Sequence, residues 1–337
     1  MTSTGLHNAM TPSAALVVLA FTIISCSSGS SSVVDRSSCI EDPLVDTPGL
    51  QKWEAELLQN CRGLDVDGGP VSALGDVRPI LFLPSSTGKP LARAHATLGM
   101  KALHNFFFDM CKYEFDRALG VDPSLRAAYW GRALCDAQLL WNAENVSSSV
   151  SFLIAAPPAP TDSDEDRLNT LYLSAVAALN GGEHPPFSPT AVQATRPARY
   201  QSYSDQLQLL SRSWPDDKTA RSFVALSKLA VGSVGKCELN TSAQCQTALN
   251  EARSLLKQAY DEDRAFPGTL HYGMHAHDFP DIMIIDAGLV YARDYPRYVK
   301  SAAHALHMPS HLWDRIGEYR KDLVVVTYVN ITAKLFL

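Results

Sequence analysis

The chain has 337 residues, of which 46% are hydrophobic and 19% are charged. This composition is typical of a globular protein long enough for a sizeable core or a repeat array, and it excludes disorder throughout. The formal net charge of −6 provides no basic surface for phosphate backbones, so nucleic-acid binding is not expected.

Residues 1–26 are predicted to be a signal peptide. The apolar run from Ala14 to Ile24 has the length of a signal-peptide core and is too short for a membrane span of about 20 residues. We therefore expect a secreted protein without a membrane span. The alternative is a bacterial lipoprotein signal ending at Cys26, which would anchor the protein to a membrane.

Cysteines and glycosylation sequons agree with export. An even number of cysteines remains after cleavage, which suits an oxidising compartment. These residues are Cys39, Cys61, Cys111, Cys135, Cys237 and Cys245. The pairs Cys111–Cys135, on adjacent antiparallel helices, and Cys237–Cys245, around a short loop, are candidates for disulfide bonds, with buried free thiols as the alternative. Three N-glycosylation sequons begin at Asn145, Asn240 and Asn330.

Residues 27–90 are predicted to form an irregular amino-terminal extension. Its first part is rich in Ser, Asp and Pro and indicates a flexible leader. A short helix is expected near Leu50, followed by a long loop. From Leu91 the spacing of apolar residues changes to that of long helices, which gives a helical domain over residues 91–337.

The first two helices of this domain have the spacing of a tetratricopeptide repeat. Small residues, an aromatic residue and a proline occupy the expected positions at Leu98, Gly99, Cys111, Phe115, Ala118 and Pro123. Phe115 is expected to fill the groove between the paired helices, and Pro123 to end the second one. The next repeat begins on time, because Tyr129 follows His95 by 34 residues.

The later elements continue this pattern with two interruptions. Loops are expected over 142–166 and 183–197, where Pro and Asp cluster. Helices are expected over 167–182, 198–215, 217–234, 248–263 and 284–303, with a further helix beginning near Pro267. Residues 322–337 should form the second helix of an incomplete last repeat, since no polar capping helix follows.

Six of the ten histidines fall between His271 and His311. On a helix, His271, His275 and Asp278 would share one face, whereas His277 would point away. A second face would carry His304, His307 and His311, provided that Pro309 only kinks its helix. The two stripes lie 33 residues apart, close to one repeat, so they should occupy neighbouring parallel helices.

Four motifs resemble those of a largely uncharacterised family of tetratricopeptide-repeat proteins. They are LHNFFFD (103–109), AAYWGRALC (127–135), LHYGMHAHD (270–278) and HALHMPSHLWDRIGEY (304–319). The resemblance covers residues 91–319 and implies an all-α, tetratricopeptide-like superhelix. It implies no reaction, because no activity is assigned to the family.

Three interpretations of the histidine stripes follow. They bind a divalent transition metal (zinc, copper or iron) through His271, His275, Asp278, His304, His307 and His311, with Asp314 and Arg315 orienting a small-molecule substrate. Alternatively, the concave face that they line binds a protein or peptide, or the histidines only pack and cap helices. His104 is a lesser candidate on the same face. Tyr129, Trp130 and Trp141 are expected to be core or groove aromatics.

Overall fold

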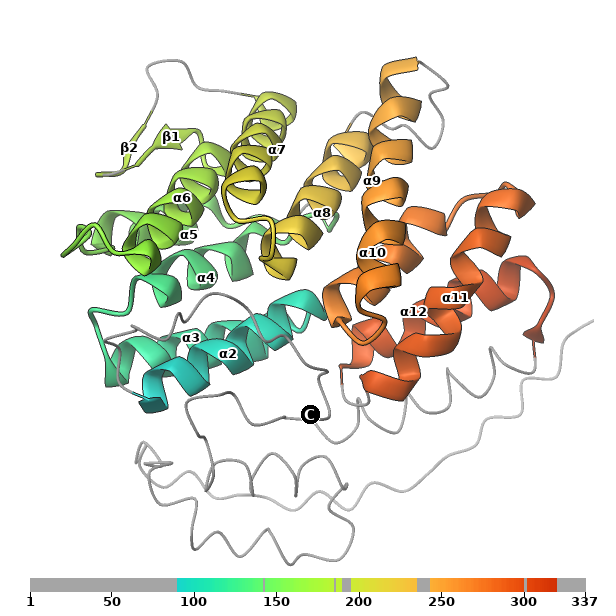
Figure 1. Cartoon of the computed structure of the whole chain (residues 1–337), viewed down its shortest axis with the longest axis horizontal. Helices are drawn as coiled ribbons and strands as arrows, with labels where there is room; N and C mark the ends of the chain where they lie inside the picture. The colour runs from blue at the N-terminus through green and yellow to red at the C-terminus, as the bar shows by residue number, and fades with distance from the viewer. Residues whose placement is uncertain are drawn as a thin grey trace, which may run out of the picture. The chain divides into compact units, whose positions relative to one another are not determined.

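The computed structural model describes residues 90–319 apart from 142, 185, 190–194, 235–242 and 300–301. This part of the chain is helical, with one small two-stranded sheet (Figure 1). The predicted all-α class is therefore confirmed for the described residues. The predicted signal peptide and extension, the Cys237–Cys245 pair and the helix over 322–337 lie outside them.

The described helices follow one another with short connections. They are α2 (Pro90–His104), α3 (Phe108–Val121), α4 (Arg126–Ala137), α5 (Val146–Ala155), α6 (Asp164–Leu179), α7 (Arg196–Ser213), α8 (Lys218–Val234), α9 (Ala243–Glu262), α10 (Pro267–His277), α11 (Ile282–Tyr298) and α12 (Ala303–Arg315). The antiparallel strands are β1 (Gly182–Glu183) and β2 (Ser188–Pro189). No helix of this described part is long and apolar enough to span a membrane.

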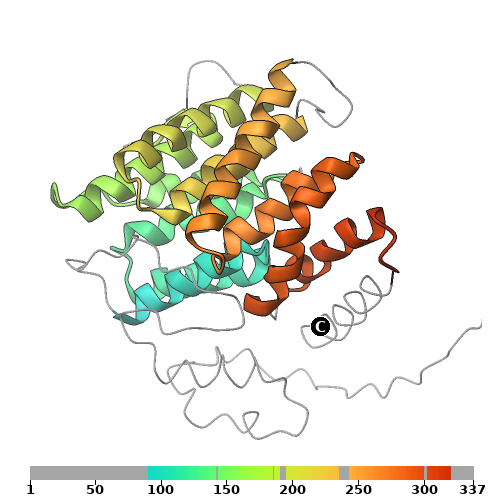
Figure 2. The ribbon, with the colours of Figure 1, turned by 45° about the vertical axis from the view of Figure 1, so that its right-hand side comes forward.

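Two kinds of contact organise the helices. Consecutive helices pack side by side, as Figures 1 and 2 show. In addition, α2 contacts α4, and α4 contacts α6. In the same way, α8 contacts α10, and α10 contacts α12. The even-numbered helices therefore form two layers, one of α2, α4 and α6 and one of α8, α10 and α12. The beginning and end of the described chain also meet, because α2 contacts α10. This last contact brings the LHNFFFD segment to the histidine-rich helices.

The predicted loop over 142–166 is wrong, because it contains α5. The Asn145 side chain accepts a hydrogen bond from the backbone N–H of Ser148, at 3.1 Å, and so caps the helix. Ser149 and Leu153, four residues apart, are buried on one face. A run of serines at the start of α5 hides this helical period in the sequence.

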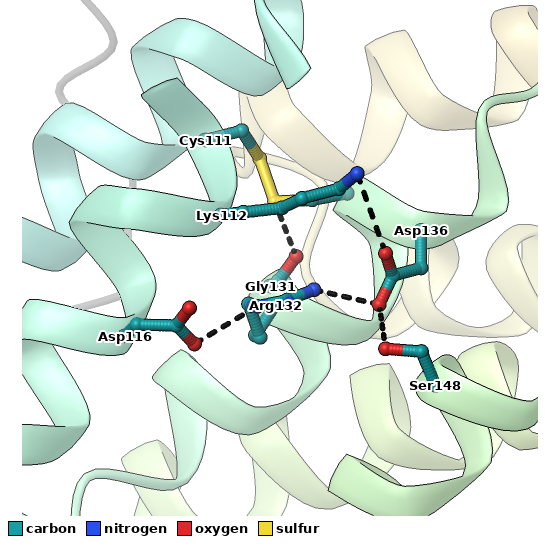
Figure 3. Close-up of a disulfide and its surroundings, with 8 residues drawn as sticks. Cys111, Lys112, Asp116, Gly131, Arg132, Asp136 and Ser148 are labelled. Atoms are coloured by element: carbon teal, nitrogen blue, oxygen red, sulfur yellow. Dashed lines mark hydrogen bonds and ion pairs between the residues drawn. A yellow bond between two sulfur atoms is a disulfide. The ribbon is translucent and has the colours of Figure 1, made fainter. Parts of the chain in front are cut away.

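A disulfide bond joins Cys111 of α3 to Cys135 of α4, as predicted (Figure 3). Charged side chains surround it and link the same two helices. Arg132 of α4 donates to Asp116 of α3 at 2.9 Å and to Asp136, one helical turn further along α4, at 2.6 Å. Helices α3 and α4 are thus held together by a covalent bond and by a charge-assisted hydrogen bond.

Helix α10 lies between two hydrophobic cores. Tyr272 and Ala276 belong to the larger core, formed mainly by α2 to α9, whereas Leu270 and Met274 belong to a smaller core with α11 and α12. Helix α10 is therefore packed on opposite faces. Polar side chains on this helix are consequently removed from water unless they reach one of its ends.

Phe115 fills the groove between the first paired helices, as predicted. Its side chain is 1% exposed. A Cβ atom built on Gly99 would lie 2.7 Å from the Phe115 ring, and one built on Gly131 would lie 2.3 Å from it. These two glycines are therefore required by close packing, because any larger residue would displace the ring.

We predict that Gly131→Ala lowers the free energy of unfolding by roughly 1–3 kcal/mol, the usual cost of overpacking a core. Gly120→Ala is the matched control, because a Cβ at Gly120 on α3 has no atom within 4 Å. Alanine favours helix over glycine by about 1 kcal/mol, so the control should be neutral or stabilising. Urea unfolding of both variants checks this, and an equal effect of the two substitutions would contradict the packing argument.

Candidate metal centre

Three histidines meet between α10 and α12. One ring nitrogen from each of His271, His275 and His304 lies within 4.8 Å of the other two. His271 and His275 are one helical turn apart on α10, which places their rings on one face. His304 lies in the first turn of α12, which packs against α10. We call these three residues the histidine triad.

A long-range hydrogen bond orients the first member of the triad. The Nδ1–H of His271 donates to the backbone carbonyl of His104, at 2.8 Å, across the contact between α10 and α2. A carbonyl can only accept, so the proton is on Nδ1 and the Nε2 atom of His271 carries a free lone pair. Metal-binding histidines are commonly held in this way by a carbonyl on their other nitrogen.

The Nε2 atoms of all three histidines are buried without a hydrogen-bond partner in the described part of the protein. Burial lowers the pKa of His271 far below its ordinary value, that of His275 to about 4 and that of His304 to about 2, and neighbouring imidazoles lower the pKa values of His271 and His304 further. At neutral pH the three rings are therefore uncharged. Each offers a lone pair, which is the form that binds a metal ion.

Aromatic side chains enclose the triad. The ring centroid of Phe106 lies 4.6 Å from that of His271, 5.5 Å from that of His275 and 5.6 Å from that of His304. Trp141 adds an edge-to-face contact with His304 at 4.8 Å. These contacts keep the imidazoles in an apolar surrounding. Sequence reasoning missed Phe106, and the only signal for it was its place in the LHNFFFD motif.

Phe106 has a left-handed backbone conformation, with φ of 52°. Gln138 and Leu140, in the connection that carries Trp141, also have positive φ angles, of 40° and 72°. Such conformations are strained for residues with a Cβ and concentrate at functional sites. Both segments that enclose the triad are therefore held in strained turns by the packing around them.

His104 lies beside the triad but has a different role. Its side chain is fully buried, with Nδ1 3.0 Å from the Tyr272 hydroxyl and the ring stacked on Phe223 at a centroid distance of 5.0 Å. It lies close to the histidine-rich helices, because α2 contacts α10. It contributes its carbonyl to His271, and its ring joins α2 to α8 and α10.

Two of the other three predicted ligands, Asp278 and His311, form a separate cluster with Arg315. The expectation that Asp278 continues the helix face of His271 and His275 is wrong, because α10 ends at His277 and the Asp278 backbone turns away with ψ of 65°. The Asp278 carboxylate instead accepts hydrogen bonds from His311 Nδ1–H, at 2.9 Å, and from Arg315 Nε, at 2.6 Å. These two interactions hold the pKa of Asp278 at about 2, although burial opposes them.

His307 connects the two groups. Its ring centroid lies 4.8 Å from that of His304 and 5.0 Å from that of His311. Helix α12 continues through Pro309, so these three histidines share one face as predicted. His311 is 41% exposed at its side chain, whereas His304 is partly buried, so the row runs from the interior to the surface.

The remaining predicted residues are placed as follows. Trp130 is fully buried and stacks on Tyr172 at 4.1 Å, which confirms it as a core residue. Tyr129 packs at the edge of the core and donates to the carbonyl of Pro123. Trp141 is 44% exposed and contacts His304, so it belongs to the surroundings of the triad. His277 points away from the triad, as predicted, and contacts Tyr291.

Comparisons of the chain with protein-family models, with curated proteins and with solved structures found no match. The resemblance to tetratricopeptide-repeat proteins therefore stays a prediction from the four motifs. What can be said of function depends on the geometry of the triad and its surroundings.

We predict that His104 makes the metal-free protein acid-sensitive. Burial lowers its pKa from 6.5 to about 3, so the unfolded state binds a proton on this ring that the folded state excludes. The free energy of unfolding is therefore highest above pH 6.5. As the pH falls from 7 to 5, protonation of His104 in the unfolded state lowers this free energy by about 2 kcal/mol.

Urea unfolding of the wild type and of His104→Gln at both pH values measures this contribution. The variant is less stable at pH 7, but its stability should fall by about 2 kcal/mol less on acidification. Other buried histidines titrate in both proteins and cancel in the difference. Identical pH dependence in the two proteins would contradict a buried, neutral His104.

Proposed function

We propose that this protein binds a divalent transition metal through the Nε2 atoms of His271, His275 and His304. The observation that carries the proposal has two parts: one ring nitrogen of each histidine lies within 4.8 Å of the other two, and the buried Nε2 atom of each has no hydrogen-bond partner in the described part of the protein. A buried polar atom without a partner costs about 1–3 kcal/mol, so three in one place favour a bound ion over a packing role.

The chemistry of the triad favours zinc among the candidate metals, with copper and iron as alternatives. Imidazole nitrogens suit all three ions. Zinc in catalytic sites characteristically has three protein ligands and an open fourth position, at metal–nitrogen distances of about 2.0–2.1 Å. Side-chain rotations would bring one nitrogen of each histidine to this distance from a shared ion. The open position would supply a Lewis acid or an activated water.

Asp278, His307 and His311 support the site without being ligands in this proposal. The triad has no charge of its own, so a divalent ion would leave two positive charges in a largely apolar surrounding. Asp278 is a compensating group, since its charge raises the pKa of His275 against the effect of burial. Its bonds to His311 and Arg315 keep the carboxylate ionised and in place.

The same proposal includes a tetratricopeptide-like superhelix. Support comes from the alternation of paired neighbours with contacts between every second helix, and from the packing of Phe115 on Gly99, both at expected repeat positions. The contact between α2 and α10 fits such a curved array. It also fills the inner face near the triad with His104, Phe223 and Tyr272, which does not favour an extended peptide there.

Export to an oxidising compartment is also proposed. The Cys111–Cys135 disulfide supports it, because such bonds are rare in reducing cytosol. The Asn145 sequon is accessible, since its side chain is exposed at the start of α5. We therefore expect native protein to lack the segment 1–26, and mass spectrometry of the reduced and unreduced protein checks this. An intact amino terminus and fully alkylatable cysteines would contradict export.

We predict that zinc, copper or iron follows the native protein at near one equivalent. His275→Gln and His304→Gln should each weaken metal affinity by more than about 100-fold. This threshold separates a ligand from a residue that only orients a ligand, whose loss typically weakens metal affinity by about 10- to 100-fold. His311→Gln is the matched control on the same helix face as His304, and it should retain the metal with less than about a tenfold change.

Elemental analysis and competition with a chelator measure these affinities, and circular dichroism checks that helicity is unchanged. Equal metal loss in all three variants would contradict the division between the triad and the Asp278 cluster. Substoichiometric metal in the wild type and in every variant would remove the metal proposal and leave peptide binding and a packing role as the remaining hypotheses.

A further inference from the structure

A small cavity adjoins the triad. It has a volume of about 170 Å³ and reaches His275, Asp278 and Trp141. The cavity lies where the connection after α4, helices α8 and α9 and the end of α10 come together. Because Trp141 also contacts His304, the cavity is bordered by two side chains that touch or belong to the triad.

The cavity has both polar and apolar walls, and its apolar wall is partly aromatic. Leu229 and Leu249 are 4% and 3% exposed, and they face the cavity together with Trp141 and Phe279. Phe279 is fixed in turn, because the guanidinium of Arg253 lies 4.8 Å from its ring centroid. An apolar cavity of about 150 Å³ is known to hold one benzene ring, so the volume here fits a single aromatic ring.

The polar end of the cavity selects for a hydrogen-bond donor. Each carboxylate oxygen of Asp278 accepts one hydrogen bond, from Arg315 or from His311, and each has a second lone pair available. A ligand hydroxyl or amine can donate to this carboxylate, whereas a ligand carboxylate would be repelled by it. His275, which borders the same end, brings the proposed metal within reach of the same heteroatom.

We propose that this cavity is the substrate site and that it binds a monocyclic phenol or arylamine, with the ring between Trp141 and Phe279 and the hydroxyl or amino group directed to Asp278 and the metal. The contact between the metal and the ligand's hydroxyl or amino group rests on the proposed metal function. The ring and the carboxylate contact do not depend on the metal, so the two proposals can fail separately.

The test uses 4-fluorophenol as the probe and ¹⁹F NMR titration as the readout, with the metal-free and the zinc-loaded full-length protein. Zinc content is measured on the same samples. We expect saturable binding that is at least tenfold tighter with zinc than without it. Fluorobenzene, which lacks the donor, should bind the zinc-loaded protein at least tenfold more weakly than 4-fluorophenol. In the metal-free protein, where no cation offsets Asp278, 4-fluorobenzoate should bind at least tenfold more weakly than 4-fluorophenol.

Two substitutions fill the cavity from different helices. Ser233→Phe on α8 and Leu249→Phe on α9 both add an aromatic ring at a lining position, and Ser233→Ala is the matched control. Each filling variant that retains helicity and zinc should bind 4-fluorophenol at least tenfold more weakly. Ser233→Ala should bind it within about twofold of the wild type.

The outcomes separate the two proposals. Zinc-loaded wild type that does not bind 4-fluorophenol, or filled variants that bind it as well as the wild type, would overturn the substrate site and leave the metal site intact. Preference of the metal-free protein for 4-fluorobenzoate would overturn the assigned ligand class. If the wild type takes up no zinc, the metal proposal fails. In that case, 4-fluorophenol binding to the metal-free wild type that is lost in the filled variants supports the cavity. If the metal-free wild type does not bind 4-fluorophenol either, the cavity proposal is overturned as well.

Discussion

The hydrogen bond from His271 Nδ1–H to the carbonyl of His104 is the constraint on which the site depends. It joins residues 167 positions apart in the sequence. This bond fixes the tautomer of His271, and the close approach of α2 to α10 that permits it also places Phe106 against all three imidazoles. Without this contact, His271 would lose both its carbonyl partner and the Phe106 ring.

The site also concentrates local costs. Phe106, Gln138 and Leu140 have positive φ angles, and strain of this kind costs about 1–3 kcal/mol at each residue. Three buried nitrogens lack partners nearby. Most natural sequences avoid such a combination in a core. The surrounding packing, including the fully buried His104 and Tyr272, offsets these costs, and a bound ion would satisfy the nitrogens directly.

Much of the fold could be predicted from the sequence because its signals are local. The helical period, the Gly99–Phe115 packing and the Cys111–Cys135 bond depend on residues that are close together in the sequence, and the structure confirms all three for the described residues. Helix α5 was missed because serines and an asparagine cap interrupt its apolar period. Loop predictions from Pro and Ser content cannot detect a short helix of this kind.

The site was predicted only in part, for physical reasons. The i, i+4 spacing of His271 and His275 and the repeat spacing to His304 were sufficient for the triad. Whether α10 would extend to Asp278 depended on where the helix ended, which spacing alone does not fix. The contact of α2 with α10 joins helices that are far apart in the sequence, so neither the role of the His104 carbonyl nor that of Phe106 could be read from local spacing.

X-ray absorption spectroscopy at the metal edge of the zinc-loaded protein tests the central claim most directly, because it reports the ligands rather than the metal content. The account predicts a first shell at about 2.0–2.1 Å containing three imidazole nitrogens and one light atom, with the outer-shell scattering of imidazole rings. A shell made only of oxygen atoms, or one with fewer than two imidazoles, would contradict a metal centre built on His271, His275 and His304.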